Sequence, residues 1–290
     1  MTRLGIYEKA LPDDLSWLDR LYLVKRLGFD FIEMSIDESE ERLVRLQWSE
    51  KEMNRIRQAM EVTGVQIHSI CLSGHRRFPF GSSNEKTRTE AFTMMKRAIQ
   101  LAYHLGVRII QVAGYDVYYE EKSIDSREKF IRGLTASVKE AAQYGIILSI
   151  EVMDDPFMNS ISKYLELKKQ IRSPYLQVYP DLGNLAAWHK SDAALELEKG
   201  IEYITSVHLK DTLAVTPTSA GKFREVPFGE GCVDFLGLLK TLKRIGFEGP
   251  FLIEMWCGAQ QDFEQQIIQA KKYLLPILNK AGYIRENNFK

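Results

Sequence analysis

Four residues of metal-binding type occupy the ends of successive short apolar runs: Glu151, Asp181, His208 and Glu254. A carboxylate within an apolar run is costly unless it is paired or holds a metal ion. Taken singly, each acid is equally typical of a helix cap or an ion pair, and His208 of a hydrogen-bonded core histidine. Together, three oxygen donors and one nitrogen donor favour a site for one divalent ion such as Mn2+, Mg2+, Co2+ or Zn2+.

The predicted metal site indicates a particular chemistry. A metal ion that chelates a carbonyl oxygen and the neighbouring hydroxyl acidifies the proton on the hydroxyl-bearing carbon and stabilises the enediolate. Glu151 and Glu254 are expected on opposite sides of the metal, so that one removes the proton and the other returns it on the opposite face. We therefore predict that Glu151 and Glu254 form a catalytic pair that inverts a carbon next to a sugar carbonyl.

Eight short apolar runs alternate with segments of helical period, a pattern typical of an α/β protein with a parallel sheet. The runs expected to be strands are 4–7, 31–34, 65–70, 107–112, 147–151, 176–179, 204–208 and 251–254. Glycines such as Gly28 and Gly106 stand where a helix should end before the next strand. Eight such units without a linker fit a closed (β/α)8 TIM barrel, so residues 1–290 are expected to form a single domain. Two long loops after strands, 71–86 and 210–234, are expected to enclose a substrate.

Charge and cysteine content narrow the classes of function. Lys plus Arg and Asp plus Glu both count 39, so the chain has no general attraction for nucleic acid or anionic membranes. No apolar stretch approaches the roughly 18 residues that span a bilayer, and no signal peptide is recognisable. Cys71, Cys232 and Cys257 are odd in number and far apart, which suggests neither disulfides nor a thiolate zinc site. We expect a small-molecule partner and a reducing, cytoplasmic compartment.

A basic segment follows the third predicted strand. Ser73, His75, Arg76 and Arg77 offer a hydroxyl, backbone N–H donors and cationic side chains, which together suit a phosphate group. Lys9, after the first strand, is expected to add a charge from a neighbouring side of the barrel mouth. Adjacent arginines more often pair with surface acids, so a structural role for this segment stays open.

Other polar residues are further candidates for substrate contacts. Lys222 and Arg224, after the seventh strand, form a rival basic cluster. Lys210 is expected either to contact the substrate or to position the metal-binding histidine. His68 is placed near the ligand end of the third strand, where a substrate hydroxyl contact and a buried core role are both open. Glu33 either bonds the substrate or forms a charge pair inside the barrel.

Motifs around these residues resemble those of a known family. They are I-E-V-M-D (150–154), P-D-L-G-N (180–184), V-H-L-K-D-T (207–212), P-F-G-E-G-C-V-D-F (227–235), I-E-M-W (253–256), L-G-I-Y-E-K-A-L (4–11) and C-L-S-G-H-R-R-F-P-F-G-S (71–82). Across essentially the whole chain they are similar to the xylose-isomerase-like sugar epimerases. The fuller set resembles the L-xylulose/L-ribulose-5-phosphate 3-epimerases of ascorbate and pentulose catabolism.

The resemblance implies a xylose-isomerase-like (β/α)8 barrel with isomerase activity. The implied reaction is epimerisation of a ketopentose 5-phosphate at C3, L-xylulose 5-phosphate to L-ribulose 5-phosphate, with one divalent metal ion. By resemblance, Glu151, Asp181, His208 and Glu254 would be the metal ligands, with Glu151 and Glu254 as the acid–base pair. The sequence departs from the family pattern at none of these four positions. A homodimer is expected by analogy alone.

Three other functions remain alternatives. The same barrel could epimerise or isomerise an unphosphorylated ketose, which binding of phosphate near Arg76 would argue against. A nuclease resembling the apurinic-site endonucleases would need more histidine ligands than the five histidines provide, and a basic face for DNA. A barrel without catalytic activity that serves as a binding module is disfavoured by the intact Glu151 and Glu254.

Overall fold

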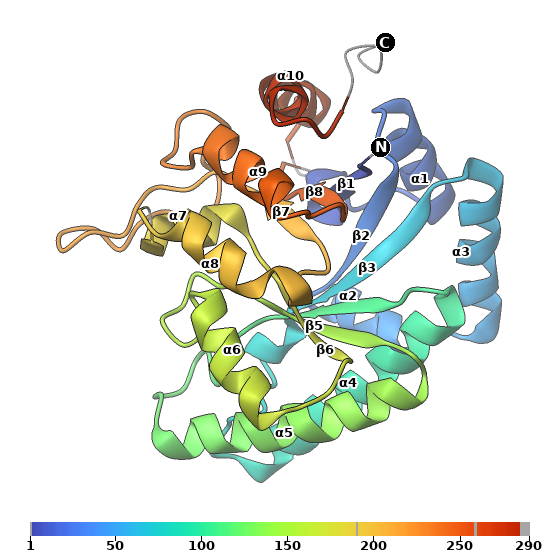
Figure 1. Ribbon diagram of the computed structural model, residues 1–290. Helices are drawn as coiled ribbons and strands as arrows, with labels where there is room; N and C mark the ends of the chain where they lie inside the picture. Colours follow the sequence, from blue (N-terminus) through green and yellow to red (C-terminus); the bar gives the residue numbers. More distant parts are fainter. Residues whose placement is uncertain (1, 190, 258–259, 285–290) are drawn as a thin grey trace.

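Eight parallel strands form one sheet that curves into a barrel, with helices around the outside (Figure 1). The computed structural model describes residues 2–189, 191–257 and 260–284. The strands are β1 (Leu4–Tyr7), β2 (Phe31–Ile36), β3 (Gln66–Leu72), β4 (Ile109–Val112), β5 (Ile147–Glu151), β6 (Leu176–Tyr179), β7 (Val207–Leu209) and β8 (Phe251–Ile253). They run in the order β6-β5-β4-β3-β2-β1-β8-β7, and bridges from Val178 to Ile204 and from Asp181 to His208 join the two ends. The predicted (β/α)8 fold is confirmed.

Helices follow the strands and pack against their outer surface. They are α1 (Trp17–Arg26), α2 (Glu40–Leu43), α3 (Glu50–Thr63), α4 (Glu85–Leu105), α5 (Ile124–Gln143), α6 (Ile161–Gln170), α7 (Leu182–His189), α8 (Ala193–Gly200), α9 (Phe235–Arg244) and α10 (Phe263–Lys280). α4 ends, as predicted, at Gly106, whose φ of 75° is the left-handed conformation that glycine adopts without strain. α10 completes the ring beside α1, where Arg26 pairs with Glu264 at 2.6 Å.

The alternation of side chains along the strands separates the core from the barrel interior. In β2, Ile32, Met34 and Ile36 belong to the large hydrophobic core. Phe31 belongs instead to a small cluster with Tyr7, Cys71 and Leu252. Because successive strand residues face opposite sides, Glu33 shares the inner face with Phe31. The apolar core therefore lies between sheet and helices, and polar groups are gathered inside the barrel.

Two strands differ from the predicted boundaries in a way that affects the site. β3 continues to Leu72, two residues beyond the predicted end, so its carboxyl end lies at the start of the 73–84 loop. β7 begins at Val207 and not at residue 204, since Ile204 makes only an isolated bridge to Val178. In parallel barrels the carboxyl ends of the strands form the active-site mouth, and a shifted boundary changes which side chains reach it.

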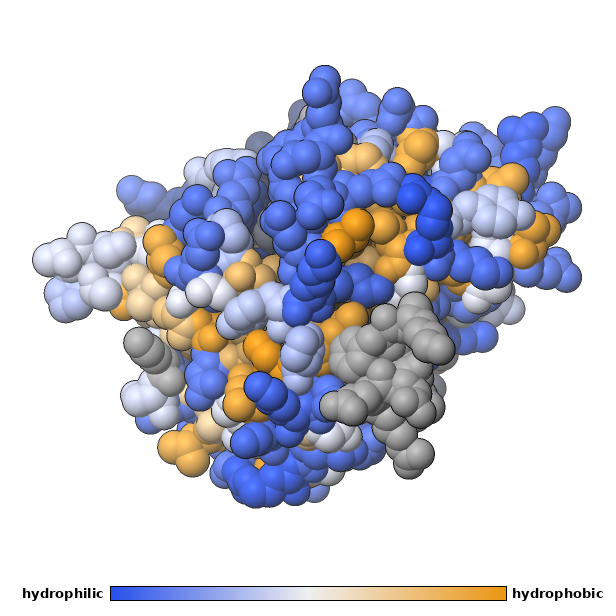
Figure 2. All heavy atoms as spheres, turned by 90° about the horizontal axis from the view of Figure 1, so that it is seen from above, coloured by the Kyte–Doolittle hydropathy of each residue, from blue (hydrophilic) through white to orange (hydrophobic). Residues whose placement is uncertain are grey.

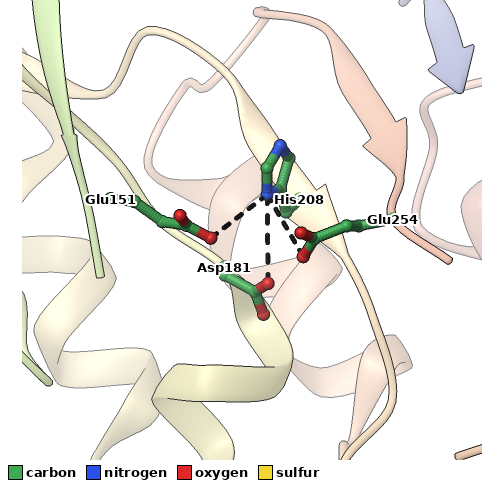
Figure 3. Close-up of side chains that lie close together, drawn as sticks. All are labelled: Glu151, Asp181, His208 and Glu254. Atoms are coloured by element: carbon green, nitrogen blue, oxygen red, sulfur yellow. Dashed lines mark ion pairs between the residues drawn. The ribbon is translucent and has the colours of Figure 1, made fainter. Parts of the chain in front are cut away.

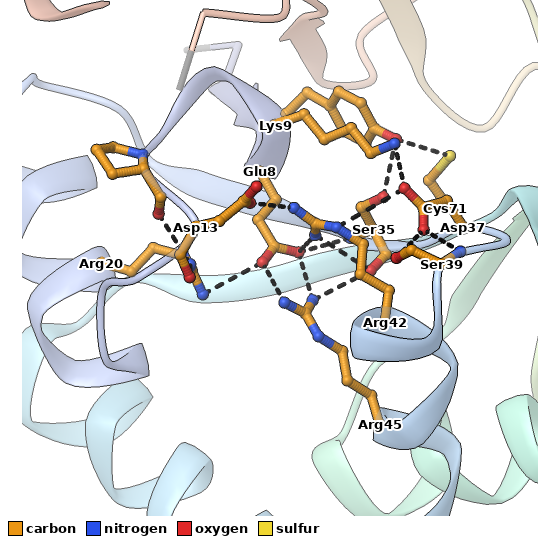
Figure 4. Close-up of polar contacts among 12 residues, drawn as sticks. Glu8, Lys9, Asp13, Arg20, Ser35, Asp37, Ser39, Arg42, Arg45 and Cys71 are labelled. Atoms are coloured by element: carbon orange, nitrogen blue, oxygen red, sulfur yellow. Dashed lines mark hydrogen bonds and ion pairs between the residues drawn. The ribbon is translucent and has the colours of Figure 1, made fainter. Parts of the chain in front are cut away.

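A buried carboxylate anchors the segment after β1 (Figure 4). Glu8 has no exposed surface, and its oxygens contact Arg45 at 2.7 and 2.8 Å, Arg42 at 3.0 Å and Arg20 at 3.2 Å. Burial by itself raises the pKa of Glu8, but Arg45 and the other two arginines outweigh it and lower the pKa. The ionised carboxylate thus joins the β1 end to α1 and to the segment around α2.

The face of the molecule seen from above carries mostly polar side chains (Figure 2). Figure 2 shows a largely hydrophilic face interrupted by separate hydrophobic patches. Among the helices of the described residues, none combines the length and hydrophobicity needed to cross a bilayer. Cys71, Cys232 and Cys257 are free thiols.

Candidate active site at the barrel mouth

Four ligand-type side chains meet at the carboxyl ends of β5 to β8. Glu151 ends β5, Asp181 follows β6, His208 lies in β7 and Glu254 follows β8. One ligand atom from each lies within 4.8 Å of all the others, and all four residues are buried. His208 Nδ1 is 3.6 Å from Glu151 Oε1, 3.9 Å from Asp181 Oδ2 and 3.5 Å from Glu254 Oε2. Figure 3 shows Glu151 and Glu254 reaching toward His208 from opposite sides, with Asp181 between them.

The backbone of the closing strands fixes these positions. Asp181 and His208 form the bridge that joins the two ends of the sheet, and the His208 N–H donates to Pro180 O at 3.0 Å. The Asp181 carboxylate accepts the Asn184 N–H at 2.8 Å, and the Glu254 N–H donates to Leu209 O at 2.9 Å. The site is therefore built on strand ends, which hold side chains more rigidly than long loops do.

Lys210 enters the cluster and compensates part of its charge. Its Nζ lies 2.7 Å from Asp181 Oδ2 and 2.9 Å from Glu254 Oε2, and its side chain is buried. Burial raises the pKa of Asp181 to about 8 although Lys210 opposes the shift. Burial also raises the pKa of Glu151, whereas Lys210 and His208 outweigh burial and lower the pKa of Glu254. The raised pKa values of Asp181 and Glu151 indicate that the single ammonium of Lys210 does not compensate the charge of three buried carboxylates.

The donor set fits a divalent cation. His208 Nδ1 is buried and has no hydrogen-bond partner among the described residues, while it faces the three carboxylates. Burial by itself lowers the pKa of His208, but the carboxylates of Glu33 and Glu254 raise it well above its usual value, so the surroundings favour a positive charge here, either on the ring or on a cation bound to it. One imidazole nitrogen and three carboxylates suit Mn2+, Mg2+, Co2+ or Zn2+. A bound cation would favour the ionised form of these carboxylates and compensate the negative charge that Lys210 leaves.

Some of the predicted substrate-binding residues lie with this cluster, and some do not. Lys9, Ser73, Arg76, Lys210 and Arg224 line the cavity at the mouth together with Glu151 and Glu254. Sequence reasoning did not single out several other residues of the same cavity: Tyr7, Cys71, Met153, Asp154, Asn184 and Phe223. Tyr7 ends β1 and Cys71 lies one residue before the end of β3, so their strand-end positions are the signal that could have found them.

Arg76 is a cation of the mouth that forms no ion pair with any residue the structure describes. Its guanidinium carbon lies 5.6 Å from the ring centre of Tyr115 and 5.4 Å from that of Tyr118. The Tyr115 hydroxyl in turn donates to Asp154. Burial lowers the pKa of Arg76, but Tyr115 and Asp154 outweigh it and raise the pKa, so the side chain keeps its charge. No ion pair of Arg76 with a carboxylate is found among the described residues, and its buried Nε has no hydrogen-bond partner there, which leaves a donor available to an anion.

Lys9 and Arg224 reach the mouth in different surroundings. Lys9 forms an ion pair with Asp37 and lowers the pKa of that carboxyl, which is about 2. Arg224 lies over the ring of Trp256, 5.3 Å from its centre. Lys222, the other member of the rival basic cluster, is exposed and donates to Glu225 O at 2.8 Å. Only Arg224 of that cluster therefore joins the cavity.

Arg77 and His75 are placed away from the cavity. Arg77 is exposed and pairs with Glu40 at 2.5 Å, which matches the alternative role of a surface arginine. His75 is buried with its ring 4.5 Å from that of Phe80, and burial lowers its pKa to about 4. The short helix Ser73–Arg76 turns successive side chains in different directions, so the basic segment does not act as one unit.

His68 lies at the opposite end of β3 from the mouth. The extended strand makes it the third residue from the amino end, where its ring bonds Ser206 at 3.1 Å and Arg3 at 3.4 Å. Burial, reinforced by Arg3, lowers its pKa to about 4. Of the two open roles of His68, this placement matches the core role and not a substrate contact at the mouth. The reason is that β3 extends two residues beyond its predicted end, which leaves His68 near the amino end of the strand.

Asp211 explains the glycine-rich motif after β7. Its carboxylate accepts the backbone N–H groups of Gly229 at 2.9 Å, Gly231 at 3.0 Å and Thr212 at 2.9 Å. A Cβ on Gly231 would overlap the Asp211 carboxylate, so glycine is required there. Through these hydrogen bonds, the G-E-G motif holds the long loop against the end of β7, and this loop carries Arg224.

Comparison with known proteins agrees with this arrangement. Residues 21–277 match the model of the xylose isomerase-like TIM barrel family. The L-ribulose-5-phosphate 3-epimerase UlaE of Escherichia coli ATCC 8739 is 47% identical over 281 residues, 97% of this chain and 96% of the relative. The chain belongs to the L-ribulose-5-phosphate 3-epimerase family of xylose isomerase-like TIM barrels. It is accordingly an isomerase of the epimerase type, as the sequence predicted.

Other similarities extend over the same length. SgbU of Escherichia coli K12 is 51% identical over 282 residues, 97% of this chain and 98% of the relative. The crystal structure of D-allulose 3-epimerase from Methylomonas sp. superposes with a TM-score of 0.75 at 17% identity, covering 96% of this chain and 98% of that one. At this low identity the structural match supports the fold alone.

Proposed function

We propose that this single-domain epimerase uses a divalent metal ion to interconvert L-xylulose 5-phosphate and L-ribulose 5-phosphate at C3. The observation that carries the proposal is the buried cluster of Glu151, Asp181, His208 and Glu254 at the barrel mouth. The family membership and the name of the 47% identical relative support the choice of a ketopentose phosphate. A cytoplasmic location and a homodimer are part of the same proposal.

The four cluster residues would hold the metal ion. When bound, a divalent ion supplies Lewis-acid chemistry, which acidifies a proton next to a carbonyl. Lys210 contacts Asp181 and Glu254 and would orient both carboxylates while it moderates their repulsion. Burial of the cluster excludes bulk water, which strengthens each electrostatic contact in the site.

Glu151 and Glu254 are the proposed acid–base pair. They approach His208 from opposite sides, so a sugar carbon between them would present one face to each carboxylate (Figure 3). Removal of the C3 proton by one glutamate and return of a proton by the other inverts that carbon. The same geometry serves both directions of the reaction, because each glutamate acts as base in one direction and as acid in the other.

The basic side of the mouth would hold the phosphate. Arg76 has no acidic ion-pair partner within the described part of the chain, and Ser73 and Lys9 line the same cavity. Arginine binds phosphate through paired N–H donors, and binding at this remote end would hold the reacting carbon between the two glutamates. Arg224 is an additional phosphate contact on the opposite loop.

Epimerisation by the metal-stripped and metal-reloaded protein tests the proposal. The chain is treated with chelator, reloaded with Mn2+ and incubated with L-ribulose 5-phosphate, and the products are resolved by 13C NMR. We expect L-xylulose 5-phosphate only after reloading and little turnover of unphosphorylated L-ribulose. Efficient turnover of L-ribulose would favour the unphosphorylated substrate, and an aldose product would indicate an aldose–ketose isomerase.

A further inference from the structure

Glu33 is a carboxylate buried inside the barrel, on the side of His208 away from the metal-ligand cluster. It has no exposed surface, and its Oε1 lies 2.9 Å from His208 Nε2. Its Oε2 accepts the Ser69 hydroxyl at 2.5 Å. Neither a lysine nor an arginine of the described residues is within 4.0 Å of it. A buried carboxylate with such partners is costly unless a positive charge lies close by.

The strand register builds this contact. β2 and β3 pair Ile32 with Ile67 and Glu33 with Ser69, so one residue of β3, His68, is left out of the register. A β-bulge of this kind re-aims the side chains that follow it. It brings the Ser69 hydroxyl directly beside Glu33, and β7 supplies the imidazole from across the barrel.

The contact determines which nitrogen of His208 carries a proton. A carboxylate only accepts hydrogen bonds, so Nε2 must donate to Glu33. In the neutral, metal-binding ring, Nδ1 then presents its lone pair to the other side, where it faces Glu151, Asp181 and Glu254 and has no hydrogen-bond partner among the described residues. The ring of Tyr179, 4.5 Å from the imidazole centre, holds the ring in this orientation.

We propose that Glu33 is a positioning residue that prepares His208 for metal binding. It fixes the Nε2–H tautomer and the ring orientation, and its negative charge makes Nδ1 a stronger donor; Ser69 holds Glu33 in place. The inference rests on the proposed metal site and adds a residue that touches neither metal nor substrate. Carboxylate partners of metal-bound histidines typically change metal affinity by about 10- to 100-fold.

The test compares Mn2+ affinity of the wild type and Glu33→Gln by calorimetric titration of the metal-stripped protein. Glutamine has nearly the same size, but its amide can donate as well as accept and so no longer selects the tautomer. We expect Glu33→Gln to bind Mn2+ about 10- to 100-fold more weakly and Glu33→Asp to recover part of the affinity. Ser149→Ala is the matched control, since this buried hydroxyl contacts Thr205 at 2.7 Å and neither Glu33 nor His208.

The outcomes separate this inference from the proposed function. Equal Mn2+ affinity of wild type and Glu33→Gln overturns the role of Glu33 and leaves the metal site intact. Failure of the wild type to bind Mn2+ contradicts the proposed function itself, and the role of Glu33 with it. If Glu33→Gln does not fold, two-bond 1H–15N spectra of the Zn2+-loaded wild type decide. A proton on His208 Nε2 supports the inference, and a proton on Nδ1 overturns it.

Discussion

Replacing Arg76 with alanine should lower kcat/KM for L-ribulose 5-phosphate and leave kcat/KM for unphosphorylated L-ribulose unchanged. Arg76 lines the mouth cavity, lies over two tyrosine rings and forms no ion pair with an acid in the described ranges. In the proposed function, the donors of its guanidinium would bind the phosphate of a sugar whose other end lies at the carboxylate–histidine cluster. Alanine removes these donors and leaves the glutamates and the metal ligands in place.

The expected size of this loss in kcat/KM follows from the free energy of a hydrogen bond to a charged group. A hydrogen bond to a charged group contributes about 1.5–3 kcal/mol, and tenfold in kcat/KM corresponds to about 1.4 kcal/mol. Loss of the Arg76 contact should therefore reduce kcat/KM for the phosphorylated ketose by roughly 10- to 150-fold. The guanidinium already rests on Tyr115 and Tyr118, so little side-chain entropy is lost on binding, and the upper half of this range is expected.

Arg77→Ala provides the matched control in the adjacent position. Arg77 carries the same charge, but it is exposed, pairs with Glu40 and does not line the cavity. Both variants are assayed with both substrates at saturating Mn2+, and Arg77→Ala should match the wild type. The phosphate assignment is refuted if Arg76→Ala slows both substrates equally, or if Arg77→Ala is as slow as Arg76→Ala; Arg224 would then be the better phosphate contact.

Three further predictions follow from other contacts. Glu151→Gln and Glu254→Gln, each at saturating metal, should lower kcat far more than they raise KM, and near-normal kcat would remove that residue from the catalytic pair. Tyr115→Phe should lower kcat/KM for the phosphorylated substrate less than Arg76→Ala does. It removes the hydroxyl that donates to Asp154 but keeps the ring under the Arg76 guanidinium. Glu8→Gln should cost about 3–5 kcal/mol of unfolding free energy at pH 7, as measured in urea. Because the folded-state pKa of Glu8 is lowered, that difference should be fully present above the unfolded pKa of about 4.3 and shrink as pH falls below it.

The cluster of three carboxylates and one histidine could be predicted because it depends on residue type and strand order. Glu151, Asp181, His208 and Glu254 end consecutive strands of a closed barrel, and such ends meet at one mouth whatever the details of packing. The eight strands were similarly evident from their apolar runs. These features depend on periodicity, which the sequence displays directly.

The finer placements depend on three-dimensional details that the periodicity does not encode. His68 was placed near the mouth because the bulge and the extra length of β3 leave no sequence signal. Arg76 and Arg77 are adjacent in the sequence. The turn of the short helix Ser73–Arg76 places the Arg76 side chain in the cavity and the Arg77 side chain at the surface. For Glu33 the sequence leaves open a substrate contact or a charge pair inside the barrel. Its contact with His208, 175 residues later in the chain, shows the buried pair.

Deuterium incorporation at C3 tests the central claim most directly. L-ribulose 5-phosphate is incubated with the Mn2+-loaded protein in heavy water, and the recovered sugars are analysed by NMR. Proton removal by one glutamate and return by the other predicts one solvent deuterium at C3 of the L-xylulose 5-phosphate formed, and none at C1. Exchange at C1, or epimerisation without any deuterium at C3, would contradict proton transfer at C3 by Glu151 and Glu254.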